Sequence, residues 1–371
     1  MRPGAAPRVV ILFPDEWVAY SPTVTNLTRF LAETREVQVI AIHTGRMPNQ
    51  LLPADTYRLV RISPGIARVL KRLLLLPLAR WLALTLRGLR ELRATDEVVA
   101  TDTIGALAAC VLGRRFHLLS LEISNNPIMR WLVRRSACSV ITQTQERLEY
   151  LLRPADYAGK PIFLLPNAPA APAVRAGKAI VDPAQPRLIH LGHALLSHGV
   201  DAMVEMLRFV SGQFTIKGII PADVRRWLCQ HHAPMLESGR IVLDDRYLQD
   251  SEIRGFLSQF DIGFCLYDMQ RIGKHNFNYL SSPAGKMYQY FAAGLPTVGS
   301  DVIGLRPIRE FNAGILVQDQ SAQTLARAVH EIIANYSSFS ANAARAAKHF
   351  DFDAAAAQFR DFLDQRHASR G

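Results

Sequence analysis

The sequence predicts an α/β fold built from two doubly wound, Rossmann-like domains, and three observations support that prediction. A chain of 371 residues is longer than one hydrophobic core usually supports. Short apolar runs that end at turn residues alternate with helical patterns, as the strands and helices of parallel sheets do. A segment rich in alanine and proline over residues 169–186 has the composition of a linker. We therefore expect domains over residues 1–168 and 187–350, followed by a helix over 351–371.

The composition is that of a folded cytosolic protein. Hydrophobic residues make up 49% of the chain and charged residues 20%, a balance that excludes a disordered chain. The four cysteines are scattered among apolar residues without metal-ligand spacing, so we expect reduced thiols and no bound metal. The N-terminus lacks the apolar core of a signal peptide. These features predict a cytoplasmic location.

The first domain begins with a βαβ unit. Residues 8–13 and 37–42 are apolar runs that predict neighbouring parallel strands, with a helix around residues 26–31 between them. The loop over residues 14–23 follows the first strand and should face the edge of the sheet where parallel strands end, which is the functional edge. No glycine fingerprint occurs at this turn, so a dinucleotide-binding first domain is not expected.

A basic amphipathic segment follows at residues 66–93. It carries seven arginines and lysines against one glutamate, among leucine, alanine, valine and tryptophan. The pattern predicts one helix kinked at Pro77, with apolar runs too short to span a membrane. It fits either a helix that lies on an anionic bilayer surface or a core helix whose arginines extend into solvent. We predict the bilayer surface, at the inner face of the plasma membrane, because Leu73–Leu76 is apolar on every side. Signatures of nucleic-acid binding are missing, so nucleic acid is not an expected partner.

Two carboxylates follow apolar runs where strands of the first domain should end. Asp102 either caps the helix that follows it or faces the functional edge of the sheet. Glu122 either acts on a bound substrate, as a base or an orienting group, or forms an ion pair with an arginine of the next helix. The candidate partners for that ion pair are Arg130, Arg134 and Arg135.

Apolar runs predict the remaining strands. The first domain should close with strands at 140–144 and 162–167. The second should contain strands at 187–192, 215–218, 241–245, 262–266, 297–300 and 314–317. The loop over residues 268–282, which includes Lys274, is long for an α/β connection and rich in polar side chains. We predict that this loop is functional.

Residues 281–301 predict a loop, a helix, a Gly-Pro break and a buried strand. Pro283 and Gly285 precede the helix, and Gly294 supplies a left-handed C-cap at its end. The free N–H groups and the dipole at such a helix start favour an anion, and Lys286 adds a positive charge in the first turn. The alternative is an ordinary loop–helix–strand unit with a solvated lysine.

The pattern Lys-x-x-x-Tyr-x-Ala-x-Gly-x-Pro over residues 286–296, followed by Val-x-Ser-Asp, resembles the donor-site helix of family 4-like glycosyltransferases of the GT-B fold. The resemblance covers residues 187–335 and is weaker in the first domain. It implies two Rossmann-like domains that face a central cleft, with a C-terminal helix that crosses back to the first domain. It also implies a nucleotide-sugar donor bound by the second domain, no metal, and no cofactor beyond that co-substrate.

The resemblance implies roles for particular residues. Contacts to the donor and its nucleotide would come from Gly192, His193, His198, Lys274, Ser281, Gly285, Lys286, Met287 and Gln289. His193 and His198 stand where the family has an arginine and a lysine that clamp the donor diphosphate. Ser281 and Gln289 stand where it has glutamates. A histidine with an ordinary pKa near 6.5 carries only part of a charge at neutral pH, so we expect a weaker clamp. The catalytic residues would be Glu122, Lys286 and Asp102.

Together these features predict a glycosyltransferase that moves a sugar from a nucleotide-sugar to a saccharide or lipid-linked saccharide acceptor. It would work at the cytosolic membrane surface, in the synthesis of a cell-surface polysaccharide or glycoconjugate. Catalysis would depend on electrostatic stabilisation of the departing nucleotide diphosphate. Two alternatives remain open, both of the same fold: a catalytically degenerate scaffold or sugar-binding protein, and a sugar-nucleotide 2-epimerase.

Overall fold

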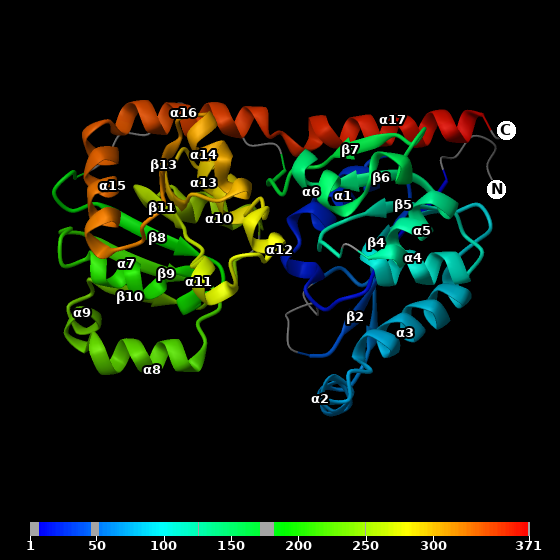
Figure 1. The fold of residues 1–371 in the computed structure, drawn as a ribbon, viewed down its shortest axis with the longest axis horizontal. Coiled ribbons are helices and arrows are strands. Elements are labelled where there is room, and N and C mark those ends of the chain that lie inside the picture. The colour runs from blue at the N-terminus through cyan, green and yellow to red at the C-terminus, as the bar shows by residue number, and fades with distance from the viewer. Residues whose placement is uncertain (1–6, 46–51, 125, 171–181, 249, 370–371) are drawn as a thin grey trace. The chain divides into compact units, whose positions relative to one another are not determined.

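The computed structural model describes residues 7–45, 52–124, 126–170, 182–248 and 250–369, and the chain forms two compact units (Figure 1). The first unit contains the residues up to Asn167 together with those from Phe352 onward, and the second runs from Ala168 to Asp351. Each is built on a parallel sheet with helices on its faces, so the predicted two-domain α/β fold is confirmed. Residues 171–181 of the predicted linker lie outside the described residues.

The first unit has a seven-stranded parallel sheet in the order β3-β2-β1-β4-β5-β6-β7. Its strands are β1 (Val9–Phe13), β2 (Val37–His43), β3 (Tyr57–Arg61), β4 (Glu97–Thr101), β5 (Phe116–Leu119), β6 (Ala137–Thr142) and β7 (Ile162–Leu164). The sheet is doubly wound, and its order reverses between β1 and β4. Binding sites in such sheets form at the carboxyl ends of the strands that flank this reversal.

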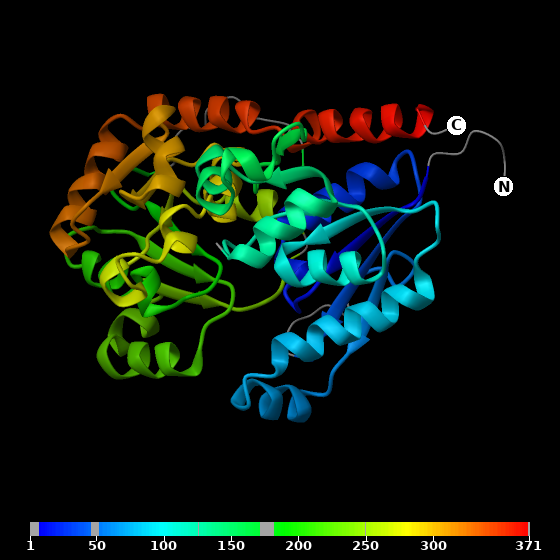
Figure 2. The same ribbon diagram turned by 45° about the vertical axis from the view of Figure 1, so that its right-hand side comes forward.

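Helices cover both faces of this sheet (Figures 1 and 2). They are α1 (Pro22–Ala32), α2 (Pro64–Arg72), α3 (Leu76–Glu91), α4 (Asp102–Val111), α5 (Pro127–Ser136), α6 (Gln145–Leu151) and α17 (Phe352–Ala368), with short 3-10 turns η1 (Val18–Tyr20) and η3 (Pro154–Asp156). Alternate residues of β1 enter different cores. Ile11 packs with α1 and α17, whereas Val10 and Leu12 pack on the side of α3 to α6. The C-terminal helix α17 therefore belongs to the core of the first unit.

The basic segment is two helices, and the prediction of one helix kinked at Pro77 was wrong. The chain leaves the helical path between α2 and α3, where Leu74 has a left-handed backbone with φ of 58°. Pro77 lies in the first turn of α3. A proline there loses no helical hydrogen bond, because the N–H groups of the first turn have no partner within the helix. The proline therefore starts a helix where we predicted that it bends one.

The second unit has a six-stranded parallel sheet in the order β10-β9-β8-β11-β12-β13, again doubly wound. The strands are β8 (Arg187–Leu191), β9 (Gln213–Lys217), β10 (Ile241–Asp244), β11 (Ile262–Cys265), β12 (Thr297–Ser300) and β13 (Gly314–Val317). The helices are η4 (Leu196–His198), α7 (Val200–Met206), α8 (Ala222–His231), α9 (Ala233–Glu237), α10 (Asp250–Leu257), α11 (Met269–Ile272), α12 (Phe277–Leu280), α13 (Gly285–Ala292), η5 (Ile303–Leu305), α14 (Arg306–Glu310), α15 (Ala322–Ala334) and α16 (Tyr336–His349). The order reverses between β8 and β11, so the segments after these strands are the expected place for a ligand.

Within the described part of the chain, no helix combines the length and the apolar character that crossing a bilayer requires.

Candidate functional site

Lys286 lies in the first turn of α13 with its ammonium group inside the second unit. The side-chain nitrogen is shielded from solvent and has no hydrogen-bond partner among the described residues. It lies 5.9 Å from the ring centroid of Tyr267, which follows β11. Burial lowers the pKa of the lysine. A buried cation without a partner is costly, so this position favours a ligand that brings negative charge.

No side chain caps the start of α13. The N-cap residue is Ala284, which has no side-chain oxygen, and no side-chain cap is formed. Gly294 has φ of 68° after the helix ends, as predicted for a left-handed C-cap. The dipole of the helix and the charge of Lys286 therefore act at the same place, which is the arrangement of an anion site.

Three histidines surround the loop that follows β8. The carbonyl oxygen of His193 accepts a hydrogen bond from Nδ1 of His198 at 2.8 Å and lies 3.3 Å from Nε2 of His190. Burial, followed by the charge of Lys286, lowers the pKa of His198 to about 4 and lowers the pKa values of His190 and His193. The histidines at the two clamp positions are therefore neutral at pH 7. From the sequence we had expected these two histidines to carry part of a positive charge at neutral pH.

The other residues predicted to contact the donor differ in what they offer. Gly192 has φ of 107°, and a Cβ built on it would meet no atom within 4 Å, so its backbone borders open space. Gly285 opens α13, and Gln289 is buried further along that helix. The side chain of Ser281 is buried and its hydroxyl donates to the carbonyl of Phe277 at 2.6 Å.

Met287 and Lys274 lie at opposite extremes of exposure. The side chain of Met287 is fully buried in the apolar core beneath α13, and its N–H bonds to the carbonyl of Ala284. Met287 is thus a core residue. Lys274 is exposed, between α11 and α12. The segment 268–282 is not one long loop as predicted, because Asp268 caps α11 by accepting from the N–H groups of Gln270 and Arg271.

In the first unit, Asp102 lies at the turn from β4 to α4 with a left-handed backbone, φ of 53°. Its carboxylate accepts hydrogen bonds from the N–H groups of Leu121 at 2.9 Å and Glu122 at 3.0 Å. The N-cap of α4 is Thr101, so the alternative that Asp102 caps this helix was wrong. Burial raises the pKa of Asp102 to about 7 in spite of these two hydrogen bonds. Non-glycine residues in this conformation are uncommon and cluster at functional sites.

Glu122 is accessible to solvent beside Asp102. The ion pairs of the described residues include none between Glu122 and Arg130, Arg134 or Arg135, so that alternative was wrong. The cation that acts on Glu122 is Arg147 of α6. Desolvation of the carboxylate by the surrounding protein raises the pKa of Glu122, and the charge of Arg147 opposes that rise. Arg147 is buried, and it donates to the carbonyl of Leu121 at 2.5 Å.

Asp15 adds a third carboxylate at the strand ends of the first unit. It follows β1, and its charge contributes to the raised pKa of Glu122. Asp15 pairs with Arg80 of α3 at 2.8 Å. The loop after β1 therefore lies at the carboxyl ends of the strands, where we expected it.

Sequence reasoning missed Arg147, Tyr267 and His190. Arg147 was detectable, because it lies four residues before the buried Leu151 and so shares the apolar face of a short helix. An arginine on such a face needs a polar partner. His190 is inside an apolar strand, where a histidine is usually structural, and Tyr267 only continues the apolar run of β11. Neither offered a signal.

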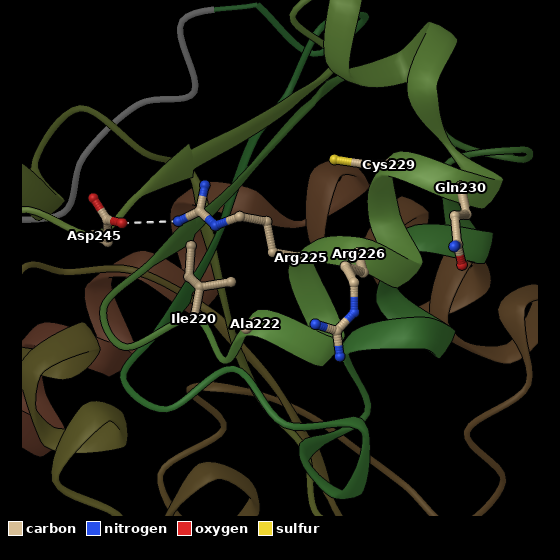
Figure 3. Close-up of a pocket in the computed structure, with 7 residues that line it drawn as sticks. All are labelled: Ile220, Ala222, Arg225, Arg226, Cys229, Gln230 and Asp245. Carbon is tan, nitrogen blue, oxygen red and sulfur yellow. Dashed lines mark hydrogen bonds and ion pairs between the residues drawn. The ribbon is translucent and has the colours of Figure 1, made fainter.

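The second unit also has a hollow of about 560 Å³ beside α8 (Figure 3). Its lining consists of Ile220, Ala222, Arg225, Arg226, Cys229, Gln230 and Asp245. In Figure 3, Arg225 reaches Asp245, with which it pairs at 2.8 Å, and Arg226 points away from this pair. No predicted donor residue lines the hollow, and the charge of Arg225 is already balanced. The site around Lys286 is therefore the better candidate for an anionic ligand.

Comparison with known proteins identifies the fold. No protein-family model matches the chain, and no curated protein sequence matches it. Among solved structures, Anabaena Alr3699/HepE in complex with UDP-glucose is 14% identical, with 96% of this chain and 99% of that chain covered and a TM-score of 0.67. The alpha,alpha-trehalose 6-phosphate synthase from Burkholderia multivorans is 14% identical, with coverages of 98% and 100% and a TM-score of 0.64. At these identities the likeness establishes the fold, which is the GT-B fold of glycosyltransferases.

Proposed function

We propose that this protein is a glycosyltransferase that takes a sugar from a nucleotide-sugar bound at Lys286 in the second unit. The observation behind this proposal is the buried ammonium group of Lys286, which has no hydrogen-bond partner among the described residues and lies at a helix start without a side-chain cap. The diphosphate of a nucleotide-sugar supplies the charge that this group lacks. The solved neighbours crystallised with UDP or UDP-glucose make a uridine nucleotide the first donor to test.

The leaving group defines the task of Lys286. When the bond between the anomeric carbon and the phosphate oxygen breaks, negative charge accumulates on the nucleotide diphosphate. A fixed cation and the positive end of α13 stabilise that charge more strongly as it develops, which is the requirement for lowering the barrier. No intermediate bonded to the protein is needed for this chemistry.

The first unit offers a base for the acceptor. Asp102, with a pKa of about 7, is ionised in an appreciable fraction of molecules at neutral pH and still basic enough to accept a proton. An acceptor hydroxyl bound beside Asp102 would lose its proton to this carboxylate. Glu122 would orient the acceptor from the neighbouring strand end.

An exposed apolar surface on α2 and α3 supports a lipid-linked acceptor. It consists of Ile66, Val69, Leu73, Leu74, Leu75, Leu78, Leu82, Leu86 and Leu89, each between 43% and 85% exposed. We call this set the α2–α3 apolar surface. Its helical members recur every three or four residues, so those of each helix share one side of that helix, and Leu73, Leu74 and Leu75 lie in the connection between the two helices. Exposed basic residues, among them Arg68, Lys71, Arg72 and Arg90, accompany it.

Apolar side chains with neighbouring cations fit the surface of an anionic bilayer. A second copy of the chain would present the same basic residues and be repelled by them, so we favour the bilayer. A glycosyltransferase held there would act on acceptors that carry a lipid, as in the synthesis of cell-surface polysaccharides or glycoconjugates.

Isothermal titration calorimetry with a panel of nucleotide diphosphates and nucleotide-sugars tests the donor site. Lys286→Ala should weaken binding by about 1.5–3 kcal/mol, the range of a charge-assisted hydrogen bond. Lys348→Ala, at an exposed lysine of α16, is the matched control and should bind as the wild type does. Unchanged affinity in Lys286→Ala would remove the assignment. If no nucleotide binds, the scaffold alternative is favoured. If the donor sugar is epimerised in the absence of an acceptor, the epimerase alternative is favoured.

A further inference from the structure

We propose that His198 takes up one proton when a phosphate-bearing ligand binds at Lys286, and so becomes the second cation of the site. The inference depends on the donor site proposed above and adds a mechanism to it. The resembling family carries a permanent lysine charge at this position, whereas here the charge would exist only while the ligand is bound.

The tautomer of His198 is fixed by a single contact. Its Nδ1 lies 2.8 Å from the carbonyl oxygen of His193, and a carbonyl oxygen only accepts hydrogen bonds. Nδ1 therefore carries the hydrogen, and Nε2 of the neutral ring has the lone pair. Nε2 is buried and has no hydrogen-bond partner within the described residues. The ring thus presents an unused proton acceptor inside the unit.

The groups around His198 explain why its Nε2 is not protonated in the free protein. Lys286 from α13 and His193 from the loop after β8 are its electrostatic neighbours, and both disfavour a second positive charge. The aromatic rings of Tyr267 and Tyr279 lie beside it, at 5.5 Å and 6.1 Å between centroids. His190, whose Nε2 faces the same carbonyl oxygen as Nδ1 of His198, is neutral.

Two carboxylates pair with an arginine that also contacts this turn. Asp201 of α7 and Asp268 before α11 both bind Arg271, at 2.7 Å and 3.2 Å. Arg271 also donates to the carbonyl of Leu196, in the same 3-10 turn as His198. Arg271 thus neutralises only part of their charge, yet no carboxylate of the described residues is among the groups that shift the pKa of His198.

A bound phosphate makes protonation of His198 favourable. Its negative charge attracts both Lys286 and a protonated His198, so the pKa of the histidine rises on binding. A proton from the buffer then bonds to Nε2, and that N–H donates to a phosphate oxygen. Because the complex holds one more proton than the free partners, affinity should rise as pH falls, by up to about tenfold per pH unit.

Calorimetry of UDP-glucose, ADP-glucose and GDP-mannose at pH 7 tests the proposal. These diphosphate diesters have no proton of their own that titrates near neutral pH. Repeating each titration in PIPES, HEPES and Tris, whose ionisation enthalpies differ, gives the number of protons taken up. We expect an uptake approaching one proton in the wild type. Binding without proton uptake overturns this inference and leaves the proposed function intact. No binding of any of the three overturns both.

The variant His198→Lys carries a permanent charge, so it should retain binding, lose the proton uptake and show an affinity that no longer changes with pH. Uptake that persists in this variant would assign the proton to another group, such as Lys286, and would overturn the proposal.

A measurement on the wild type avoids any folding defect of the variant. The ¹⁵N signal of Nε2 should move from the range of a bare imidazole nitrogen to that of an N–H when UDP-glucose is added. An unmoved signal in the saturated complex contradicts the proposal.

Discussion

The carboxylate of Asp102 accepts a hydrogen bond from the N–H of Leu121 at 2.9 Å, which ties the end of β4 to the segment after β5. Arg147 holds the carbonyl of the same residue, at 2.5 Å. The Leu121 residue is therefore held at its N–H and at its oxygen by two side chains of opposite charge. This arrangement keeps Asp102 in its left-handed conformation and fixes the direction of Glu122, the next residue.

Replacing Asp102 by asparagine should remove the proposed base with little change in structure. Asparagine tolerates a left-handed backbone, and its amide oxygen still accepts from Leu121 and Glu122. We expect kcat to fall by about 10²–10⁴-fold, the usual contribution of a general base. Wild-type activity should rise with pH up to about 7 and then level off, because the base must be ionised. Both kcat and its pH dependence can be measured from the rate at which nucleotide is released from the donor. Calorimetry identifies that donor, and saccharides and lipid-linked saccharides serve as acceptors. Unchanged kcat would exclude Asp102 as the base.

The same substitution should alter how stability depends on pH. The pKa of Asp102 is about 7 in the folded protein against an ordinary value of 3.8, so the folded state holds a proton that the unfolded state has lost. Between these values the wild type becomes less stable as pH rises, and the loss is complete above pH 7. Asparagine does not titrate. The Tm of Asp102→Asn relative to the wild type should therefore increase from pH 4 to pH 8, which differential scanning fluorimetry measures. A constant difference would contradict the raised pKa.

Tyr290→Phe should destabilise the second unit and its donor site together. The tyrosine is fully buried on α13, and its hydroxyl accepts from the N–H of Leu191 at 2.9 Å and donates toward the carbonyl of Phe264 at 3.2 Å. Phenylalanine would leave the Leu191 N–H unsatisfied, at a cost of about 1–3 kcal/mol in the free energy of unfolding. Leu191 precedes Gly192, so donor affinity should fall as well. Urea unfolding and calorimetry check the two effects, and a stability equal to that of the wild type would refute the first.

Much of the fold was predictable because parallel strands buried on both faces leave a strong signal. Continuous apolar runs such as Val9–Phe13 can only be buried, and glycine or proline ends most of them. β3 (Tyr57–Arg61) was missed because it lies at the edge of the sheet and contains two arginines. The break at Leu74 was missed for a different reason. A left-handed leucine is disfavoured locally, so no sequence rule predicts it.

Candidate site residues could be proposed from the sequence only where one residue type favours one chemistry. Lys286 was proposed because a cation in the first turn of a helix favours an anion and because the surrounding motif resembles a donor-site helix, and its role stays a prediction. The neutral state of His198 was not predictable, since it depends on burial and on a lysine that is distant in the sequence. Arg147 lies 45 residues after Asp102, and only the fold brings their charges together.

Gly304→Ala should disturb the approach to α13. A Cβ at Gly304 would lie 2.1 Å from the carbonyl oxygen of Ser282, a backbone atom that cannot move alone. The segment before α13 would have to shift, so we expect a loss of about 1–3 kcal/mol in stability together with weaker donor binding. Gly255→Ala is the matched control. It lies exposed on α10 with no atom within 4 Å of its Cβ, and alanine there should stabilise by about 0.5–1 kcal/mol. Equal donor affinity in the two variants would argue against a tight fit at Gly304.

The α2–α3 apolar surface should lose its attraction to anionic vesicles when its exposed cations are removed. Arg68, Lys71 and Arg72 are exposed on α2, whereas Arg80 and Arg87 are engaged with Asp15 and Glu91 and are poorer choices. Each basic residue near an anionic surface contributes about 1 kcal/mol. Changing the three residues of α2 to alanine should therefore weaken binding roughly 100-fold, because every 1.4 kcal/mol corresponds to about a factor of ten. Co-sedimentation with phosphatidylglycerol vesicles measures this.

The matched control removes the same charge elsewhere. Arg226, Arg254 and Arg327 are exposed in the second unit, so the triple alanine variant has the same net charge as the α2 variant. If only total charge matters, both variants release the protein equally, and the α2–α3 apolar surface is not the docking site. If the surface docks, the control stays bound. The double variant Leu78→Glu/Leu82→Glu, at positions 50% and 44% exposed, should also be released, because a bilayer interface requires apolar side chains in addition to cations.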